Sequence, residues 1–193
     1  MLVKTPKGKI EVELYKDDAG LNEDPLFYRI IAFSKDKKEM SHVNFSIQSQ
    51  KKVWLYHVAT KPNYQHMGLA TALIQVMEYF ITTKYGSDYV EGKYAPSNDY
   101  AKYFYEKNHY DIWEDSYKHY ISKSLYKKEI IQVVEPLIEG EIVIKNYQEY
   151  KKELEAQKIV QAVANNYPSI FDKKQEPADL NSNESANAKE LKI

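Results

Sequence analysis

The first third of the chain alternates hydrophobic and polar residues with the period of two that is typical of β-strands. In the segment KIEVELY, for example, Ile10, Val12 and Leu14 fall on one face. This alternation, with many β-branched and aromatic residues, predicts four strands, over residues 9–15, 26–34, 40–48 and 52–60. The polar links at 16–25, at 35–39 and at Gln50-Lys51 are short, so we expect neighbouring strands to be antiparallel.

The period then changes to that of an α-helix. From residue 67 to residue 85 the apolar residues recur every three or four positions, and Gly86 follows as the expected C-terminal stop. A strand over 88–94 comes next, followed by a second helix that is capped by Ser97 or Asn98 and ends near Lys107. Two closing strands are predicted at 110–113 and 117–124. The strand–helix–strand order makes the fourth and fifth strands parallel.

After Leu125 the pattern is less regular. Residues 126–138 are helical or mixed and are interrupted by Pro136, residues 141–144 are compatible with a short strand, and residues 146–166 have the pattern of an amphipathic helix. We expect an α+β domain over residues 1–125, with a mixed, mostly antiparallel central sheet that contains one parallel pair and is flanked by helices. A mostly helical C-terminal extension over 126–171 and a disordered polar tail over 172–193 follow it.

Composition narrows the classes of function. The net charge is −1, from 27 basic and 28 acidic residues, which gives no field that would attract a nucleic acid. The chain has no Cys, so disulfides, thiolate nucleophiles and Cys-bound zinc are excluded, and its five His lack metal-ligand spacing, so we predict no metal. Without an apolar run long enough for a membrane span or a signal peptide, we expect a cytoplasmic protein that binds no membrane. Arg29 is the only Arg, a bias best explained at the level of the coding DNA.

The segment PNYQHMGLAT, residues 62–71, joins the end of a predicted strand to the start of the strongest predicted helix. The first N–H groups of a helix have no partner within it and carry partial positive charge, so such a loop suits an anion such as a pyrophosphate. Gly68 would let the anion approach the backbone closely. An alternative is that Gly68 is only a turn residue and Ala70 only a packing residue. The dinucleotide and P-loop fingerprints are absent.

A second segment, NDYAKYFYEKNHY at residues 98–110, follows one strand later. Together the two segments resemble the GNAT superfamily of acetyl-CoA-dependent N-acetyltransferases over about residues 9–124. The first family signature is V-x-P followed by Q/R-x-x-G-x-G/A, which corresponds here to TKP at 60–62 and QHMGLA at 65–70. The second is N-x-x-A-x-x-x-Y-E/Q-K-x-G-F, which five residues match in register: Asn98, Ala101, Tyr105, Glu106 and Lys107. His109 and Tyr110 stand where the family usually has Gly and Phe.

The resemblance implies a role for each matching position. Backbone amides of the first segment would hold the pyrophosphate: Gln65, His66, Met67, Gly68, Leu69, Ala70 and Thr71. The end of the fourth strand would pair with the pantetheine arm and the acetyl group through Val58, Ala59 and Thr60, next to a bulge that splays the fourth and fifth strands apart. Asn98 would bind the pantetheine, and Tyr105 would protonate the departing thiolate. The expected reaction is direct attack of an amine on acetyl-CoA.

The resemblance leaves the base and the acceptor open. Glu91 on the fifth strand is the first candidate for the base, although it lies seven residues before Asn98 where the family spacing is about five; His57 on the fourth strand is the second. The helices that usually wall the acceptor site are absent, so the cleft is either open, which favours a protein or peptide amine, or closed by residues 126–171, which favours a small amine. Alternatively, the 146–166 helix packs on the sheet or on a second subunit of a homodimer. A non-catalytic acyl-CoA-binding module and an α+β interaction protein are the competing functions.

Overall fold

The computed structural model describes residues 1–17, 25–48, 52–115 and 118–166. Most of the predicted 16–25 link, the turn at Gln50-Lys51, the first residue of the predicted 117–124 strand and the predicted disordered tail lie outside these residues. The chain divides into two compact units, Met1–Lys151 and Lys152–Ile193. The sheet and the candidate site belong entirely to the first unit.

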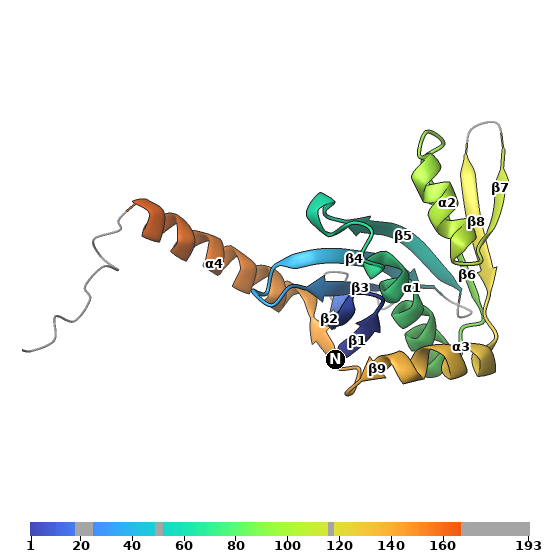
Figure 1. The fold of residues 1–193 in the computed structure, drawn as a ribbon, viewed down its shortest axis with the longest axis horizontal. Helices are drawn as coiled ribbons and strands as arrows, with labels where there is room; N and C mark the ends of the chain where they lie inside the picture. The colour runs from blue at the N-terminus through green and yellow to red at the C-terminus, as the bar shows by residue number, and fades with distance from the viewer. Residues whose placement is uncertain (18–24, 49–51, 116–117, 167–193) are drawn as a thin grey trace, which may run out of the picture. The chain divides into compact units, whose positions relative to one another are not determined.

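One mixed sheet organises the first unit (Figure 1). Its strands are β1 (Leu2–Thr5), β2 (Gly8–Asp17), β3 (Leu26–Phe33), β4 (Glu39–Ile47), β5 (Val53–Thr60), β6 (Tyr89–Tyr94), β7 (Asp111–Glu114), β8 (His119–Ser124), β9 (Ile138–Glu139) and β10 (Ile144–Asn146). The spatial order is β7-β8-β6-β5-β4-β3-β2-β1-β9, and β10 pairs with β2. The β5–β6 and β2–β10 pairs are parallel and the other pairs are antiparallel. The predicted sheet and its parallel pair are therefore confirmed.

The helices are α1 (Leu69–Phe80), α2 (Asp99–Lys107), α3 (Lys127–Val134) and α4 (Tyr147–Asn166). None of the helices in the described residues is long and apolar enough to cross a membrane. The predicted 67–85 helix begins later than expected, because Gly68 is left-handed (φ 77°), and its last turn, Ile81–Tyr85, is a π-helix that ends at left-handed Gly86. Asn98 caps α2 as predicted, by accepting the Ala101 N–H at 3.0 Å.

The predicted strand at 141–144 is wrong. β10 begins at Ile144 and runs to Asn146, and β9 lies before the predicted range. The register of β10 is set by backbone pairing with Leu14–Lys16 of β2. A pairing partner that is about 130 residues away in the sequence cannot be inferred from local alternation, which is why the boundary was misplaced.

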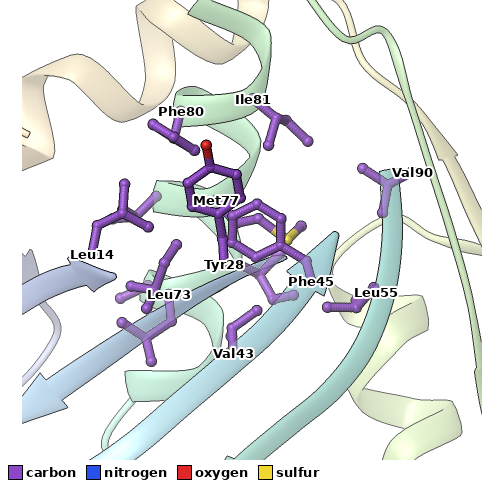
Figure 2. Close-up of a cluster of buried hydrophobic side chains, with 14 of the residues drawn as sticks. Leu14, Tyr28, Val43, Phe45, Leu55, Leu73, Met77, Phe80, Ile81 and Val90 are labelled. Carbon is purple, nitrogen blue, oxygen red and sulfur yellow. The ribbon is translucent and has the colours of Figure 1, made fainter. Parts of the chain in front are cut away.

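A hydrophobic core fills the face of the sheet that α1, α2 and α3 cover, called the helix-covered face below. The apolar side of α1 lies on β3 and β4, as the buried side chains in Figure 2 show. Alternate residues of β3, Tyr28, Ile30 and Ala32, point into this core, as do Val43 and Phe45 of β4. Burial of these side chains, worth roughly 1.5–3 kcal/mol for each large one, holds the sheet and α1 together.

The other side of the sheet, called the opposite face below, carries the intervening residues of the same strands. Tyr15 of β2 and Ile31 and Phe33 of β3 form a small cluster there with Tyr147 and Tyr150 from the first turn of α4. The start of α4 therefore packs on β2 and β3, immediately after β10 has joined the edge of β2.

The parallel pair β5–β6 is short. Pairing extends only over Val53–Leu55 and Val90–Gly92, after which the two strands diverge. On its other side, β5 shifts register against β4 between Leu55 and His57, so Tyr56 is an extra, bulged residue. The predicted bulge and splay are thus present, and they open a gap between the last residues of β5 and β6.

A buried ion pair ties α1 to the strands beyond the gap. Glu78 of α1 accepts hydrogen bonds from Lys123 of β8 at 2.8 and 2.9 Å and from the Tyr110 hydroxyl at 3.0 Å. Lys123 also donates to the carbonyl of Asn108 at 2.9 Å. Burial raises the pKa of Glu78, although Lys123 opposes the shift.

We expect Gly92→Ala to destabilise the fold by about 1–3 kcal/mol, because a Cβ at this position would lie 2.6 Å from the Leu55 carbonyl oxygen, an atom of the neighbouring backbone that cannot move aside cheaply. Urea denaturation measures the change. Ser124→Ala, at an exposed position of β8, is the control and should cost less than about 0.5 kcal/mol. A Gly92→Ala variant as stable as the wild type would contradict the close approach of β5 and β6.

We expect Lys123→Ala to cost about 3–5 kcal/mol at pH 7, since it leaves the buried Glu78 charge without its partner. Removing the cation raises the folded-state pKa of Glu78 further, so the deficit should shrink as the pH falls and the carboxyl becomes protonated. Lys102→Ala removes an exposed ion pair with Glu114, which solvent screens, so its loss should be clearly smaller. If urea denaturation gave equal losses in the free energy of unfolding for the two variants, the buried pair would contribute no more to stability than the exposed pair.

Candidate functional site

The loop between β5 and α1 forms a backbone turn with exposed N–H groups. It leaves β5 through a short 3-10 helix (Pro62–Tyr64), and His66 and Gly68 both adopt left-handed conformations, with φ of 61° and 77°. No side chain caps α1, because the N-cap residue is Gly68. The first N–H groups of α1 therefore have neither a partner within the helix nor a side-chain cap, and the positive end of the helix dipole lies with them, an arrangement that favours anions.

Gly68 is fixed by its surroundings as well as by its conformation. A Cβ on this residue would lie 3.1 Å from Cδ of Pro6, which sits in the turn between β1 and β2. The N-terminal hairpin thus supports the loop from behind. Of the predicted cradle, Gln65 donates its N–H to the Pro62 carbonyl at 3.3 Å, so its amide is already engaged. The residues from His66 to Thr71 remain the predicted holders of a pyrophosphate.

The gap between β5 and β6 lies beside this loop. The predicted pantetheine-binding residues Val58, Ala59 and Thr60 form the part of β5 beyond the bulge, where β5 still pairs with β4 but not with β6. On the β6 side this stretch has no strand partner, although the Gln65 side-chain amide donates to the Thr60 carbonyl at 3.4 Å, and an extended ligand could add to the sheet there as a strand does. Asn98 is exposed, and its side-chain oxygen caps α2, which leaves its amide N–H₂ group for a ligand.

Tyr105 is buried on the helix-covered face, where α2 meets the diverging end of β6. Its ring packs against Tyr94, Phe104 and Tyr110, with centroid distances of 6.1, 5.2 and 5.6 Å. Burial raises the pKa of Tyr105 to about 12. The phenol therefore keeps its proton throughout the physiological range, which is the form that a proton donor requires.

Glu91 lies on the opposite face, within the paired part of β6, across from Trp54 of β5. It lines a hollow of about 130 Å³, and four of the nine residues around this hollow are aromatic. In this hollow Trp113 stacks on Tyr120 at 3.9 Å, and the Lys93 ammonium lies 5.1 Å from the Tyr120 ring centroid and 5.3 Å from that of Trp54. Glu91 and Tyr105 are thus on different faces of the sheet.

A chain of hydrogen bonds also crosses the opposite face, and it was not predicted as a unit. Arg29 of β3 donates to the Glu39 carboxylate at 2.9 Å and to the Tyr147 hydroxyl at 2.6 Å. The same Glu39 oxygen contacts Nδ1 of His42 at 2.6 Å, and Nε2 of His42 lies 3.0 Å from Nδ1 of His57. The single Arg of the chain was attributed to the coding DNA, and no local sequence signal joins Arg29 to residues on two other strands. Among the described residues, no group of three acidic or histidine side chains is arranged to hold a metal ion.

The structure therefore separates the predicted residues into two sets on either side of one gap. The loop before α1, Asn98 and Tyr105 lie at the side of α1 and α2, and Glu91 lies on the opposite face with His57. A cosubstrate could enter from the helix-covered face and an acceptor from the other, and the two would meet between β5 and β6.

The fold of this chain is similar to the folds of several solved N-acetyltransferase structures. Solved structures with a similar arrangement include PaiA N-acetyltransferase of Thermoplasma acidophilum in complex with coenzyme A (21% identity, TM-score 0.47, 51% of this chain and 60% of that one). A second is the Campylobacter jejuni N-acetyltransferase PseH in complex with acetyl coenzyme A (19% identity, TM-score 0.44, covering 52% of this chain and 69% of that one). A third shows mutant forms of the spermidine/spermine N-acetyltransferase SpeG of Vibrio cholerae (14% identity, TM-score 0.44, covering 55% of this chain and 70% of that one). The matched part thus spans less than two thirds of the Thermoplasma protein, and these identities are too low to transfer a substrate.

The search of curated protein sequences returned no match. The family model of the acetyltransferase (GNAT) family matches residues 5–110, from the end of β1 to the start of β7. That range contains the loop before α1, the gap and α2, and it covers more than half of the chain. The chain belongs to the GNAT family of acetyltransferases.

Proposed function

We propose that this protein transfers an acetyl group from acetyl-CoA to a primary amine by direct attack of the amine on the thioester. The observation that carries the proposal is the gap between β5 and β6, which opens beside the uncapped start of α1 and next to Tyr105. Membership of the GNAT family supports acetyl-CoA as the donor.

The residues of the helix-covered face would bind the donor. The N–H groups from His66 to Thr71 would hold the pyrophosphate, and the backbone of Val58–Thr60 would align the pantetheine arm along β5. Tyr105 would give its proton to the thiolate as the C–S bond breaks. These groups contribute mainly by positioning and by stabilising charge.

The acceptor amine would approach on the opposite face. There the start of α4, with Tyr147 and Tyr150, covers β2 and β3, so residues 144–150 supply a wall on one side. On the other side lies the aromatic hollow with the exposed Trp113. A face walled on one side and bordered by exposed aromatic rings suits an alkylammonium group, which aromatic rings attract. The two candidates for the base from the sequence, Glu91 within this hollow and His57 on β5, both lie on this face.

The decisive experiment incubates the full chain with labelled acetyl-CoA and three acceptors: a lysine-containing peptide, a peptide with a free N-terminal amine, and spermidine. We expect transfer to at least one of them, together with heat of coenzyme A binding in calorimetry. Binding without transfer would instead indicate a non-catalytic acyl-CoA-binding module. The absence of both would overturn the proposal.

We expect Gly68→Trp to abolish coenzyme A binding and Gly68→Ala to weaken it at least tenfold, because any Cβ here meets Pro6 and strains a left-handed residue. Isothermal titration calorimetry gives the affinity. Gly140→Ala carries the same strain (φ 86°) with no atom within 4 Å of its Cβ, so it should leave the affinity unchanged. Unaltered binding by Gly68→Trp would remove the loop from the site.

We expect Tyr105→Phe to retain coenzyme A binding and to lower kcat by about 10²-fold, because the thiolate would lose its proton donor. Tyr103→Phe, which changes an exposed tyrosine of the same helix, should behave as the wild type. Steady-state kinetics and calorimetry measure the two quantities separately. Equal kcat values for Tyr105→Phe and the wild type would exclude Tyr105 as the donor.

A further inference from the structure

We propose that His57 Nε2 is the general base that takes the proton from the acceptor ammonium, and that His42 and Glu39, anchored by Arg29, hold its ring in the required tautomer. This inference rests on the proposed acetyl transfer and concerns the proton acceptor, for which Glu91 is the rival.

The hydrogen-bond chain fixes which nitrogen of each ring is free. A carboxylate can only accept, so Glu39 takes a hydrogen bond from His42 Nδ1 at 2.6 Å. With both rings neutral, His42 Nε2 must then accept from His57 Nδ1, which lies 3.0 Å away. The remaining nitrogen of His57, Nε2, carries the lone pair. A carboxylate that orients a histidine in this way is the arrangement that makes an imidazole an effective base.

His57 stands at the right place for this task. It is the residue just after the bulge at Tyr56 and just before Val58, at the point where β5 leaves β6. Its side chain is exposed on the opposite face, whereas Val58 packs against the core on the helix-covered face. Glu91 pairs across from Trp54, three residues earlier along β5, or roughly 10 Å at strand spacing. His57 is therefore nearer to the stretch of β5 that is predicted to hold the thioester.

The charges around His57 keep it in the basic form. Partial burial and the positive charge of Arg29 on β3 lower the pKa of His57 below its ordinary value, so at neutral pH the ring is uncharged. Glu39 balances Arg29: burial would raise the pKa of Glu39, but His42 and Arg29 outweigh this and lower it. On β6 the groups of the same face are Glu91 and Lys93. From α4, the hydroxyl of Tyr147 accepts a hydrogen bond from Arg29.

The protons and electrons of the proposed step balance. His57 Nε2 removes one proton from the ammonium, and the freed nitrogen lone pair forms the C–N bond with the thioester carbonyl carbon. The C–S bond then breaks and its electron pair leaves on sulfur. Tyr105 protonates the thiolate and recovers its proton from the amide-forming nitrogen. His57 finally releases its proton to solvent, so the products are the N-acetyl amine, coenzyme A and one proton.

The kinetic arm compares His57→Gln, Glu39→Gln and Glu91→Gln with the wild type, using whichever of the three acceptors is acetylated fastest. We expect His57→Gln to lower kcat/KM at pH 7 by 10²-fold or more, to remove the acidic limb of the pH profile, and to leave the calorimetric affinity for coenzyme A unchanged. Glu39→Gln removes a negative charge while Arg29 stays, so its acidic limb should move to lower pH. His109→Asn, an exposed histidine at a left-handed position, is the matched control and should change neither quantity.

A second arm does not depend on the acceptor. In an NMR titration of the isotopically labelled protein, we expect His57 to titrate below its ordinary pKa with Nε2 as the unprotonated nitrogen, and this tautomer preference to be lost in His42→Gln. A His57→Gln variant with wild-type kcat/KM and pH profile, loss of the acidic limb in Glu91→Gln instead, or a free ring with Nδ1 unprotonated would each overturn the proposal. Absence of coenzyme A binding by the wild type, with the NMR result intact, would count against the acetyl transfer and not against the hydrogen-bonded chain.

Discussion

The candidate site depends on the short length over which β5 and β6 pair. Their parallel pairing covers three residues on each strand and ends at Leu55 and Gly92. Gly92 allows the two backbones to approach, because a side chain there would meet the Leu55 carbonyl, and the bulged Tyr56 then turns β5 away. The result is a sheet that is closed at one end of this pair and open at the other. Backbone N–H and C=O groups of β5 beyond Leu55 therefore have no partner strand on the β6 side, where a ligand could bind.

The open end is useful because its two sides differ chemically. On the helix-covered face, the uncapped start of α1 and the neutral phenol of Tyr105 suit an anion and a departing thiolate. On the opposite face, imidazole and carboxylate groups can accept a proton. In the proposed reaction, the group that protonates the thiolate and the group that first deprotonates the ammonium would therefore lie on different faces of the sheet.

The segment after α3 completes the opposite face. β10 adds to β2, and the first turn of α4 places Tyr147 and Tyr150 over Tyr15 and Phe33. Tyr147 also accepts a hydrogen bond from Arg29, so the same segment that covers the sheet helps to fix the charged chain that reaches His57. In the proposed function, this packing would form one wall of the acceptor face. It favours the reading that residues 144–150 close part of the acceptor face over a face that is open throughout.

The sequence by itself determined the strands from β2 to β8 and the helices α1 and α2, because strand alternation, helix periodicity and the stop at Gly86 are local effects. It did not predict β1 and β9, and it left the cap of α2 open between Ser97 and Asn98. It also located the loop at Gly68 and the pair Asn98 and Tyr105, since those residues lie in two short contiguous segments. Only the tertiary structure decided the position of β10 and the chain from Arg29 to His57. The first joins β10 to β2, and the second joins side chains of β3, β4 and β5. Residue spacing along the chain does not encode which side chains meet across a sheet.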